Sequence, residues 1–461
     1  MSEILKRLYN ACNPLRPATP PQYVDSDEAR GSRDLSRQFL SELNNIEGDF
    51  LTFLFTGHLG CGKSSELHHL AEQLRNPDPR LNSPSYFPII LDAEEFIDTY
   101  DVTPTDVLLS ILSRVAQELA KIGIELQDSF LWRRLEKVKD LLLTEIAAPK
   151  EIGVEGTFPL AKVTAKFPLL KSDPTNRDIV RKALGRDTST LKSEIKHQFE
   201  MARGRLAHKE CRKDKDGKPY RDIVLILDNL EKVDCVQGLG EGYISHRQFF
   251  LESASQLIDL GVHVIYTVPL PLVIADGPEL GQRYGSMPFV LPMIKIEERA
   301  PERTRYEPGW KTLRDLVHKR VGLDTPLESV IDKGALDFLI GCSGGNTRQL
   351  LVFIKQAATL CDEAPIGLRA AQQAIADTVS LYSRMPKRYW EQLAALELSP
   401  DQDIDTADEG LKAMLKQLIV LEYRNGGAED DPFNPSAPWY AVHPIVRALR
   451  PFKAAVKRLN G

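Results

Sequence analysis

The hydrophobic positions of this chain fall into five short apolar runs that are separated by longer amphipathic stretches. Consecutive Val, Ile, Leu and Phe over such lengths are typical of strands buried on both faces of a sheet. Because helical stretches lie between the runs, the pattern predicts an α/β fold with a parallel five-stranded sheet and helices on both faces. The strands are predicted within residues 49–55, 85–95, 223–227, 261–267 and 286–296.

A large insertion is predicted at about 101–220, between the second and third strands. Its polar and apolar pattern predicts an amphipathic helix over 102–123, an extended or hairpin segment over 153–173 and a long helix over about 188–205. We interpret the insertion as a surface for a partner or for self-association.

The C-terminal third is predicted to be mainly helical. Helical periodicity over 301–380 predicts a lid. Two or three helices then precede the stretches VLEYRNGG and WYAVHPIV, which are predicted to pair as strands across a long turn. This order is typical of a winged-helix domain, here at 381–461. The predicted organisation is completed by an N-terminal segment at 1–48 and a core at 49–300.

The first predicted strand leads directly into a glycine-rich loop, GHLGCGKSS, which fits G-x-x-x-x-G-K-[ST] and precedes a helical pattern. Glycines let successive backbone N–H groups turn inward, and with the helix N-terminus they form a cradle for phosphate oxygens. The lysine supplies charge to the β- and γ-phosphates, and the first serine hydroxyl is a ligand for Mg²⁺. We assign nucleotide contacts to Gly57, His58, Gly60, Cys61, Gly62, Lys63, Ser64 and Ser65, with Ser64 also a metal ligand.

Cys61 lies inside this loop. A small side chain that the loop accommodates is the favoured interpretation, and a redox switch with a lowered thiol pKa is the alternative.

Polar residues follow the next two buried runs. Asp228 ends one run, Glu231 follows it closely, and Thr267 ends the next. Ligands of open α/β sheets bind at the carboxyl ends of the strands. We therefore expect Asp228 to serve Mg²⁺, Glu231 to polarise the attacking water, and Thr267 to sense the γ-phosphate or that water. For Glu231, a solvated acid at a helix start is the competing interpretation.

The composition narrows the class of protein. With 461 residues, 42% of them hydrophobic and 27% charged, the chain is expected to form two or three globular domains. Six scattered cysteines without a C-x-x-C pair argue against a zinc site and a disulfide framework. No apolar run is long enough to span a membrane, and the N-terminus lacks the apolar core of a signal peptide. We expect a cytoplasmic protein without a membrane partner.

The net charge of −6 argues against wholesale nucleic-acid binding but leaves room for a local basic patch. The stretch at 203–221 is one candidate, although its interleaved acids favour a solvated loop.

In order along the chain, GHLGCGKSS, VLILDNLEKV, VIYTVP and CSGGNTRQLL resemble the motifs of the AAA+/STAND group of P-loop ATPases. The resemblance covers roughly 20–450 and implies ATP or ADP with Mg²⁺ as ligands and an ATPase activity. AAA+ proteins usually have Glu directly after the Walker B Asp, where this chain has Asn229. The D-x-x-E arrangement is more similar to NACHT- and KAP-type members, which implies slow or regulated hydrolysis.

The resemblance also implies roles for two arginines. Arg348 would contact the γ-phosphate from the lid. Arg283 is placed like an arginine finger that is offered to a neighbouring subunit, and an ordinary surface arginine is an equal alternative.

In related ATPases the segment before the loop lines the adenine, which implies this role for Tyr23, Val24 and Arg30. The stretch YAVHPIVRAL is similar to the NB-ARC MHD segment, so His443 would contact the ADP β-phosphate. Pro444 replaces the acid of that motif, and a histidine at the edge of the core is the slightly favoured alternative.

These features predict an ATP-dependent switch that hydrolyses slowly and signals its nucleotide state to a protein effector or to its own oligomer. By analogy, it would be the ATPase component of a bacterial anti-phage or signalling system. Two alternatives stay open: a DNA-associated loader, like origin-recognition or transposition-regulator ATPases, and a nucleotide-locked scaffold without turnover. The predicted recognition helix, EGLKAMLKQLIVL, carries only two lysines, which argues against reading of the major groove.

Overall fold

The computed structural model of the chain divides into two compact units, which are described separately. The sheet unit comprises Ser36–Phe55 and Leu70–Phe289, and the lid unit comprises Met1–Leu35, Thr56–His69 and Val290–Gly461. The predicted segment at 153–173 and most of the basic stretch at 203–221 lie outside the described residues. The structure describes residues 1–31, 34–78, 83–98, 102–124, 126, 188–207, 219–233, 246–399, 402–405, 408–425 and 438–460.

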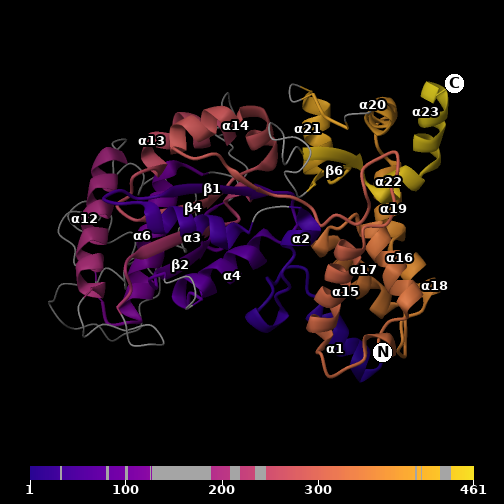
Figure 1. The fold of residues 1–461 in the computed structure, drawn as a ribbon, viewed down its shortest axis with the longest axis horizontal. Helices are drawn as coiled ribbons and strands as arrows, with labels where there is room; N and C mark the ends of the chain where they lie inside the picture. The colour runs from indigo at the N-terminus through magenta and orange to yellow at the C-terminus, as the bar shows by residue number, and fades with distance from the viewer. Residues whose placement is uncertain are drawn as a thin grey trace, which may run out of the picture. The chain divides into compact units, whose positions relative to one another are not determined.

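The central sheet is parallel, as predicted, and Figure 1 labels its strands β1, β2 and β4. Its strand order is β2-β3-β4-β1-β5. The register pairs Asp92 with Asp228 and Phe55 with Thr267, which brings the carboxyl ends of neighbouring strands to one edge. All five predicted strands are confirmed: β1 (Thr52–Gly57), β2 (Phe87–Asp92), β3 (Ile223–Asp228), β4 (His263–Thr267) and β5 (Phe289–Leu291).

The last strand is shorter than predicted. β5 ends at Leu291, whereas the apolar run continues to Ile296. The backbone N–H groups after β5 form hydrogen bonds outside the sheet. The Met293 N–H donates to the Glu422 carbonyl, and the Lys295 N–H donates to the Ala29 carbonyl.

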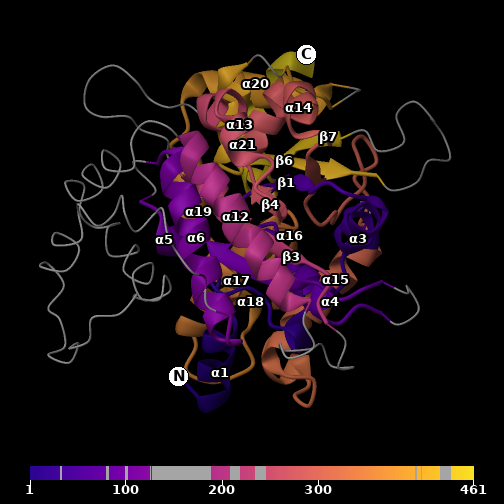
Figure 2. The same cartoon turned by 90° about the vertical axis from the view of Figure 1, so that its left-hand side faces the viewer.

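Helices cover both faces of the sheet. One face buries strand residues such as Leu225 and Tyr266 in a cluster with several helices, four of which are given below. On the other face Phe53 meets Phe39 of α3 (Leu35–Asn45) with ring centroids 5.4 Å apart. Figure 2 shows two of the four, α6 and α12, side by side, which confirms both predicted insertion helices. The four helices are α6 (Pro104–Ala120), α12 (Thr188–Leu206), α13 (Ala254–Leu257) and α14 (Leu270–Tyr284).

The lid unit is mainly helical up to residue 383, as predicted. Its N-terminal helix α1 packs on α15 and α17, and α16 packs on α17 and α18, so that leucines such as Leu313 and Leu339 are fully buried. These helices are α1 (Glu3–Ala11), α2 (Asp27–Arg30), α15 (Glu307–Val321), α16 (Lys333–Ser343), α17 (Thr347–Thr359), α18 (Leu368–Ala374) and α19 (Ala376–Ser383).

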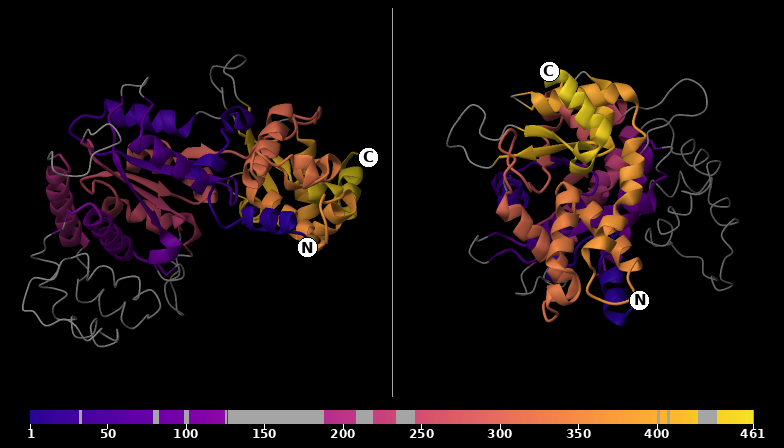
Figure 3. Two further views of the ribbon diagram at one scale, coloured as in Figure 1. Left: turned by 90° about the horizontal axis from the view of Figure 1, so that it is seen from below. Right: turned by 90° about the vertical axis from the view of Figure 1, so that its right-hand side faces the viewer.

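A two-stranded antiparallel hairpin lies near the C-terminus, and its strand pairing confirms the predicted one (Figure 3). The prediction that its second strand extends through HPIV is wrong. That strand ends at Val442, since Pro444 has no N–H for the ladder and begins a helix instead. The elements here are α20 (Lys387–Leu398), α21 (Glu409–Lys416), β6 (Val420–Arg424), β7 (Pro438–Val442), α22 (Pro444–Ala448) and α23 (Arg450–Asn460).

The winged-helix assignment and the four-part division of the chain stay predictions. Among the helices that the structure describes, none is long and apolar enough to cross a membrane.

Candidate nucleotide site

The glycine-rich loop joins β1 to α4 (Lys63–Arg75) and is closely covered by neighbouring backbone and side chains. Gly60 has a φ of +78°, and a Cβ added there would lie 2.6 Å from the Arg348 Cβ. A Cβ on Gly57 would lie 2.6 Å from the Leu291 carbonyl oxygen. Both positions therefore require glycine, for conformation or for space.

Lys63 is buried at the start of α4 and is turned back onto the loop. Its Nζ donates to the carbonyl oxygens of Gly57 and His58, at 3.0 and 3.1 Å. The ammonium, the helix N-terminus and the glycine backbone are thus gathered at one loop, which is the arrangement that binds phosphate oxygens. Ser64, the next residue, supplies a hydroxyl of the kind that ligates Mg²⁺ in such loops.

The first turn of α17 is hydrogen-bonded to this loop. Asn346 Nδ2 donates to the Leu59 carbonyl at 2.9 Å, and Thr347 Oγ1 donates to the Gly60 carbonyl at 2.8 Å. The Arg348 N–H also donates to the Gly60 carbonyl, at 3.0 Å. The structure therefore brings Arg348 against the loop. Its Nε is buried without a hydrogen-bond partner among the described residues. A γ-phosphate contact by Arg348 stays a prediction.

Arg30 braces the loop from the N-terminal segment. Its Nη2 donates to the Cys61 carbonyl at 2.7 Å, and its Nε donates to Ser26 Oγ, also at 2.7 Å. Its Nη1 donates to the Pro292 carbonyl. With all three nitrogens bonded and the side chain buried, Arg30 holds the loop in shape.

His58 connects the loop to the C-terminal hairpin. Its Nε2 accepts a hydrogen bond from the Glu422 N–H of β6 at 2.8 Å. Burial, reinforced by the nearby Lys63 charge, lowers the pKa of His58 to about 3, so the ring is neutral. The predicted nucleotide contact of His58 would therefore come from its backbone, because its side chain is turned to the hairpin.

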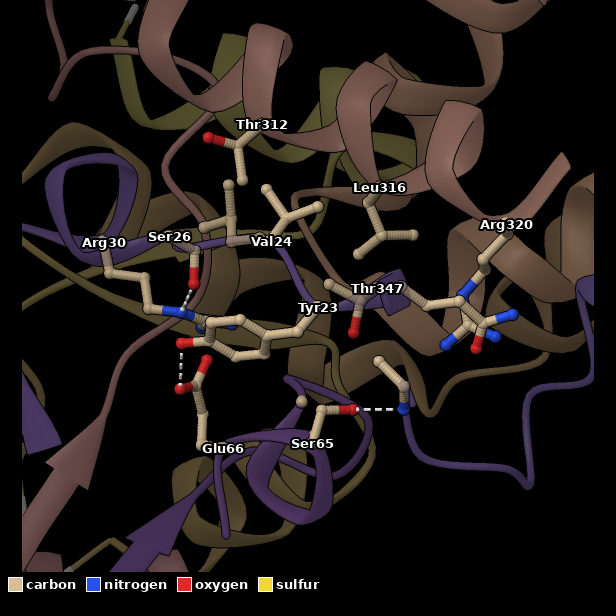
Figure 4. Close-up of a pocket in the computed structure, with 14 residues that line it drawn as sticks. Tyr23, Val24, Ser26, Arg30, Ser65, Glu66, Thr312, Leu316, Arg320 and Thr347 are labelled. Atoms are coloured by element: carbon tan, nitrogen blue, oxygen red, sulfur yellow. Dashed lines mark hydrogen bonds between the residues drawn. The ribbon is translucent and has the colours of Figure 1, made fainter. Parts of the chain in front are cut away.

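A pocket that is partly open to solvent lies beside the loop (Figure 4). It brings together the loop and the predicted residues of the N-terminal segment, with α15 as a further wall. The residues that line it are Ala18, Gln22, Tyr23, Val24, Ser26, Arg30, Gly62, Ser65, Glu66, Ile294, Thr312, Leu316, Arg320 and Thr347.

Tyr23 is held in place at this pocket by three contacts. Its ring stacks on His69 with centroids 3.8 Å apart and planes at 5°, and its hydroxyl donates to Glu66 Oε2 at 2.8 Å. Lys319 of α15 donates to its carbonyl oxygen at 2.7 Å. Burial raises the pKa of Glu66 above its ordinary value, and burial together with Asp25 raises that of Asp27 to about 7.

Ser65 anchors the N-terminal segment. Its Oγ accepts a hydrogen bond from the Ala18 N–H at 2.9 Å.

In the sheet unit, the predicted acid Asp228 ends β3 and is buried. Its Oδ1 accepts from the Asn229 N–H at 2.8 Å. Asn229 has a φ of +61°, and its Nδ2 donates to Asp92 Oδ1 at 2.9 Å. Sequence reasoning missed Asp92. Its position at the end of a buried strand, like that of Asp228, was the signal that could have found it.

Thr267 ties β4 to the end of β3. Its hydroxyl donates to the Leu227 carbonyl at 3.1 Å and accepts from the Leu230 N–H at 2.9 Å. Glu231 follows in the short 3-10 helix η4 (Leu230–Lys232), so the threonine shapes the turn that carries it. Within the described ranges, no group of three or more His, Cys, Asp or Glu side chains could hold a metal ion. An Mg²⁺ held largely by phosphate oxygens and water needs no such group.

Two further predicted residues have other partners. Arg283 is exposed near the end of α14, where it pairs with Glu279 at 3.4 Å, and its role in a neighbouring subunit stays a prediction. His443 is fully buried, and its ring nitrogens meet Gln349 Oε1 at 2.8 Å and the Ile445 N–H at 3.2 Å. Burial lowers the pKa of His443 to about 3. These contacts describe a structural histidine, and contact with ADP stays a prediction.

No model of a known protein family matches the chain, and no curated protein matches it. Three solved structures similar to this chain span nearly all of it. The Aeropyrum pernix ORC2 protein in ADPNP–ADP complexes is 11% identical with a TM-score of 0.45, over 98% of this chain and 97% of that one. A Walker-type ATPase of Pyrococcus abyssi is 14% identical with a TM-score of 0.43, over 95% and 99%. A chain of Drosophila ORC bound to DNA is 10% identical with a TM-score of 0.39, over 97% and 92%. At such identities and scores, the assignment of the site rests on this chain's own residues.

Proposed function

We propose that this chain is a switch of the AAA+/STAND type that binds ATP with Mg²⁺, hydrolyses it slowly and signals its nucleotide state through the lid. The observation that carries the proposal is the phosphate loop itself. Three consecutive residues of the lid, Asn346 to Arg348, bond its carbonyls. A loop that rearranges around phosphate would disturb these bonds, each contributing about 1 kcal/mol.

In this proposal the nucleotide is held through charge and backbone. Lys63 and the loop N–H groups bind the phosphates, and Arg348 meets the γ-phosphate from the lid. Ser64 and Asp228 serve as Mg²⁺ ligands, directly or through water. The ion would neutralise charge on the phosphates during hydrolysis.

The same proposal assigns the hydrolytic step to the sheet unit. Glu231 accepts a proton from the attacking water, and Thr267 orients the turn that carries Glu231. Asn229 occupies the place where AAA+ proteins usually have a glutamate, and its side chain is engaged with Asp92. We expect slow turnover, because the acid that would act as the base, Glu231, lies further along the chain than the glutamate of AAA+ proteins.

The signal would leave through the C-terminal hairpin. The link from His58 to the Glu422 N–H joins the phosphate loop to β6, so a change in the loop biases the position of the hairpin. We propose that a protein effector or a second copy of the chain responds, with Arg283 acting on a neighbouring subunit. A cytoplasmic anti-phage or signalling system is the role that we propose for such a switch.

Replacing Glu231 by glutamine tests the catalytic assignment. The substitution removes the base but keeps the shape of the side chain. We therefore expect ATP affinity within about twofold of the parent and turnover reduced by at least about 100-fold. Calorimetric titration and single-turnover hydrolysis measure the two quantities. Glu252→Gln, an exposed acid of the same unit, is the matched control. Unchanged turnover in E231Q would contradict the assignment and favour the scaffold without turnover.

A second candidate function, association with DNA, is favoured by the C-terminal helix. Arg450, Lys453 and Lys457 recur on one exposed face of α23, opposite the buried Phe452 and Ala455. None of the three cations forms an ion pair with a described residue. Binding to duplex DNA that weakens steeply with salt would support this candidate, and absence of binding at low salt would exclude it.

A further inference from the structure

One wall of the pocket beside the phosphate loop is built by a single face of α15. Thr312, Leu316 and Arg320 follow one another at intervals of four residues, which places them on the same side of the helix. Figure 4 shows these three side chains across the pocket from Ser65 and Glu66 of α4. The sequence signalled none of the three, because α15 was predicted only as part of a helical lid.

Arg320 is the polar group on this wall whose donors are incompletely used. Its side chain is buried, with a residue exposure of 8%. Its Nη1 donates to the Ala11 carbonyl at 3.0 Å, and its Nε is buried without a hydrogen-bond partner among the described residues. Burial lowers the pKa of the guanidinium from its ordinary value. A buried charged donor without an acceptor is costly, and Arg320 lines the pocket, so a ligand whose acceptor reaches this guanidinium would be favoured.

The other walls suit a flat, apolar ring. Val24, Ile294 and Leu316 supply aliphatic surface, and Tyr23 lines the pocket with its ring. Because the Tyr23 ring is already stacked on His69, it forms a rigid aromatic platform.

The polar neighbours of the platform are mostly engaged within the protein. The Tyr23 hydroxyl is bonded to Glu66, and Ser65 accepts from the Ala18 N–H. Arg320, whose Nε has no hydrogen-bond partner among the described residues, is thus a candidate to recognise the edge of a ring.

We propose that Arg320 reads the nucleobase of ATP: its guanidinium donates to a ring nitrogen of adenine that stacks against Tyr23. This inference rests on the proposed function and deepens it, since it names the group that distinguishes a complete nucleotide from a bare triphosphate. Arg320 is then a specificity residue, and the phosphate loop supplies binding that is independent of the base.

Five ligands separate these contributions: ATP, inorganic tripolyphosphate, and three ATP analogues in which CH replaces N1, N3 or N7 of the base. Arg320→Met keeps the apolar stem, and Arg320→Lys keeps a charge. Arg314→Met is the matched control on the same helix, because Arg314 is paired with Asp337 at 2.7 Å and does not line the pocket. Thermal melting without ligand checks that each variant is folded.

We expect R320M to bind ATP ten- to a hundredfold more weakly than the parent, as a charge-assisted hydrogen bond would give. Its affinity for tripolyphosphate should stay within twofold. One of the three analogues should bind the parent chain as weakly as ATP binds R320M, and R320M should lose nothing further with that analogue. R320K should recover part of the loss, and R314M should match the parent.

Equal losses of ATP and tripolyphosphate affinity in R320M would overturn the inference, because Arg320 would then act on phosphate or on the fold. A loss that persists with all three analogues would overturn it in favour of a ribose contact. If the parent chain bound neither ATP nor tripolyphosphate, the proposed function itself would fail. Binding of tripolyphosphate with no gain for ATP would instead leave that function standing and overturn only the role of Arg320.

Discussion

The phosphate loop and the strand-end acids both follow strands of one sheet, but different parts of the chain hold them. The loop carbonyls accept from residues remote in sequence, as when Asn346 donates to Leu59 across 287 positions. The acids are held by neighbouring strands, because the Thr267 hydroxyl bonds Leu227 and Leu230 at the end of β3.

This difference indicates which part of the site can act as a sensor. The geometry of the acids follows from sheet register, so it persists as long as the sheet does. The geometry of the loop depends on side chains from the lid, the N-terminal segment and the hairpin. If nucleotide binds at the loop as proposed, it meets backbone that Asn346, Thr347 and Arg348 hold, so we expect binding and these contacts to bias each other.

The largest effect is expected for Lys63→Ala. This change removes the ammonium that sits on the loop carbonyls, so nucleotide affinity should fall at least about 100-fold, or about 3 kcal/mol. Titration with ATP and ADP measures it, with Lys311→Ala, an exposed lysine of α15, as the control. Retained affinity in K63A would refute the loop as the phosphate site. The proposed difference between a nucleotide-sensing loop and the strand-end acids would then fail.

A smaller effect is expected for Asn346→Ala, which sharpens the comparison. Asn346 caps α17 by accepting from the Gln349 N–H at 2.9 Å, and it also donates to the loop. We expect about 2 kcal/mol of lost stability, about 1 from the cap and about 1 from the loop bond, together with weaker ATP binding.

Asp408→Ala is the matched control for this substitution. Asp408 caps α21 by accepting from the Gly410 and Leu411 N–H groups. Its loss should cost about 1 kcal/mol and leave ATP affinity unchanged. Equal nucleotide affinities in N346A and D408A would show that the lid does not govern the loop.

The smallest effect is expected from the pH dependence of His443. Its pKa is lowered to about 3 in the fold, whereas an exposed histidine titrates near 6.5. Below pH ~6.5 the unfolded chain binds a proton that the folded chain does not, so this contribution to stability falls as pH falls. Between pH 7 and 5.5 the loss should be about 1 kcal/mol.

Acids with a raised pKa, such as Asp27, stabilise the fold as pH falls and so act in the opposite direction. Because the parent and His443→Asn share these acids, the difference between their free energies of unfolding in urea at the two pH values isolates the contribution of His443. A constant difference between the two proteins would mean that the histidine titrates normally. It would then be free to meet a phosphate, as the loop residues are expected to do.

The sheet and the phosphate loop were predictable because their signals are local. The run from Ile223 to Leu227 is apolar at every position, as expected for a strand that is covered on both faces. The spacing of Gly57, Gly62 and Lys63 fits the motif of a phosphate-binding loop. The extra length predicted for the hairpin strand failed at Pro444, where a helix start competes with strand pairing.

The sequence by itself determined the strands, the loop and the order of the acids, because each depends on residues that are close along the chain. The tertiary structure alone decided that His58 turns to the hairpin, that Asp92 joins Asp228, and that Arg320 completes the pocket. Such pairings depend on how distant segments pack, and the residue pattern within one segment does not identify the segment that it contacts.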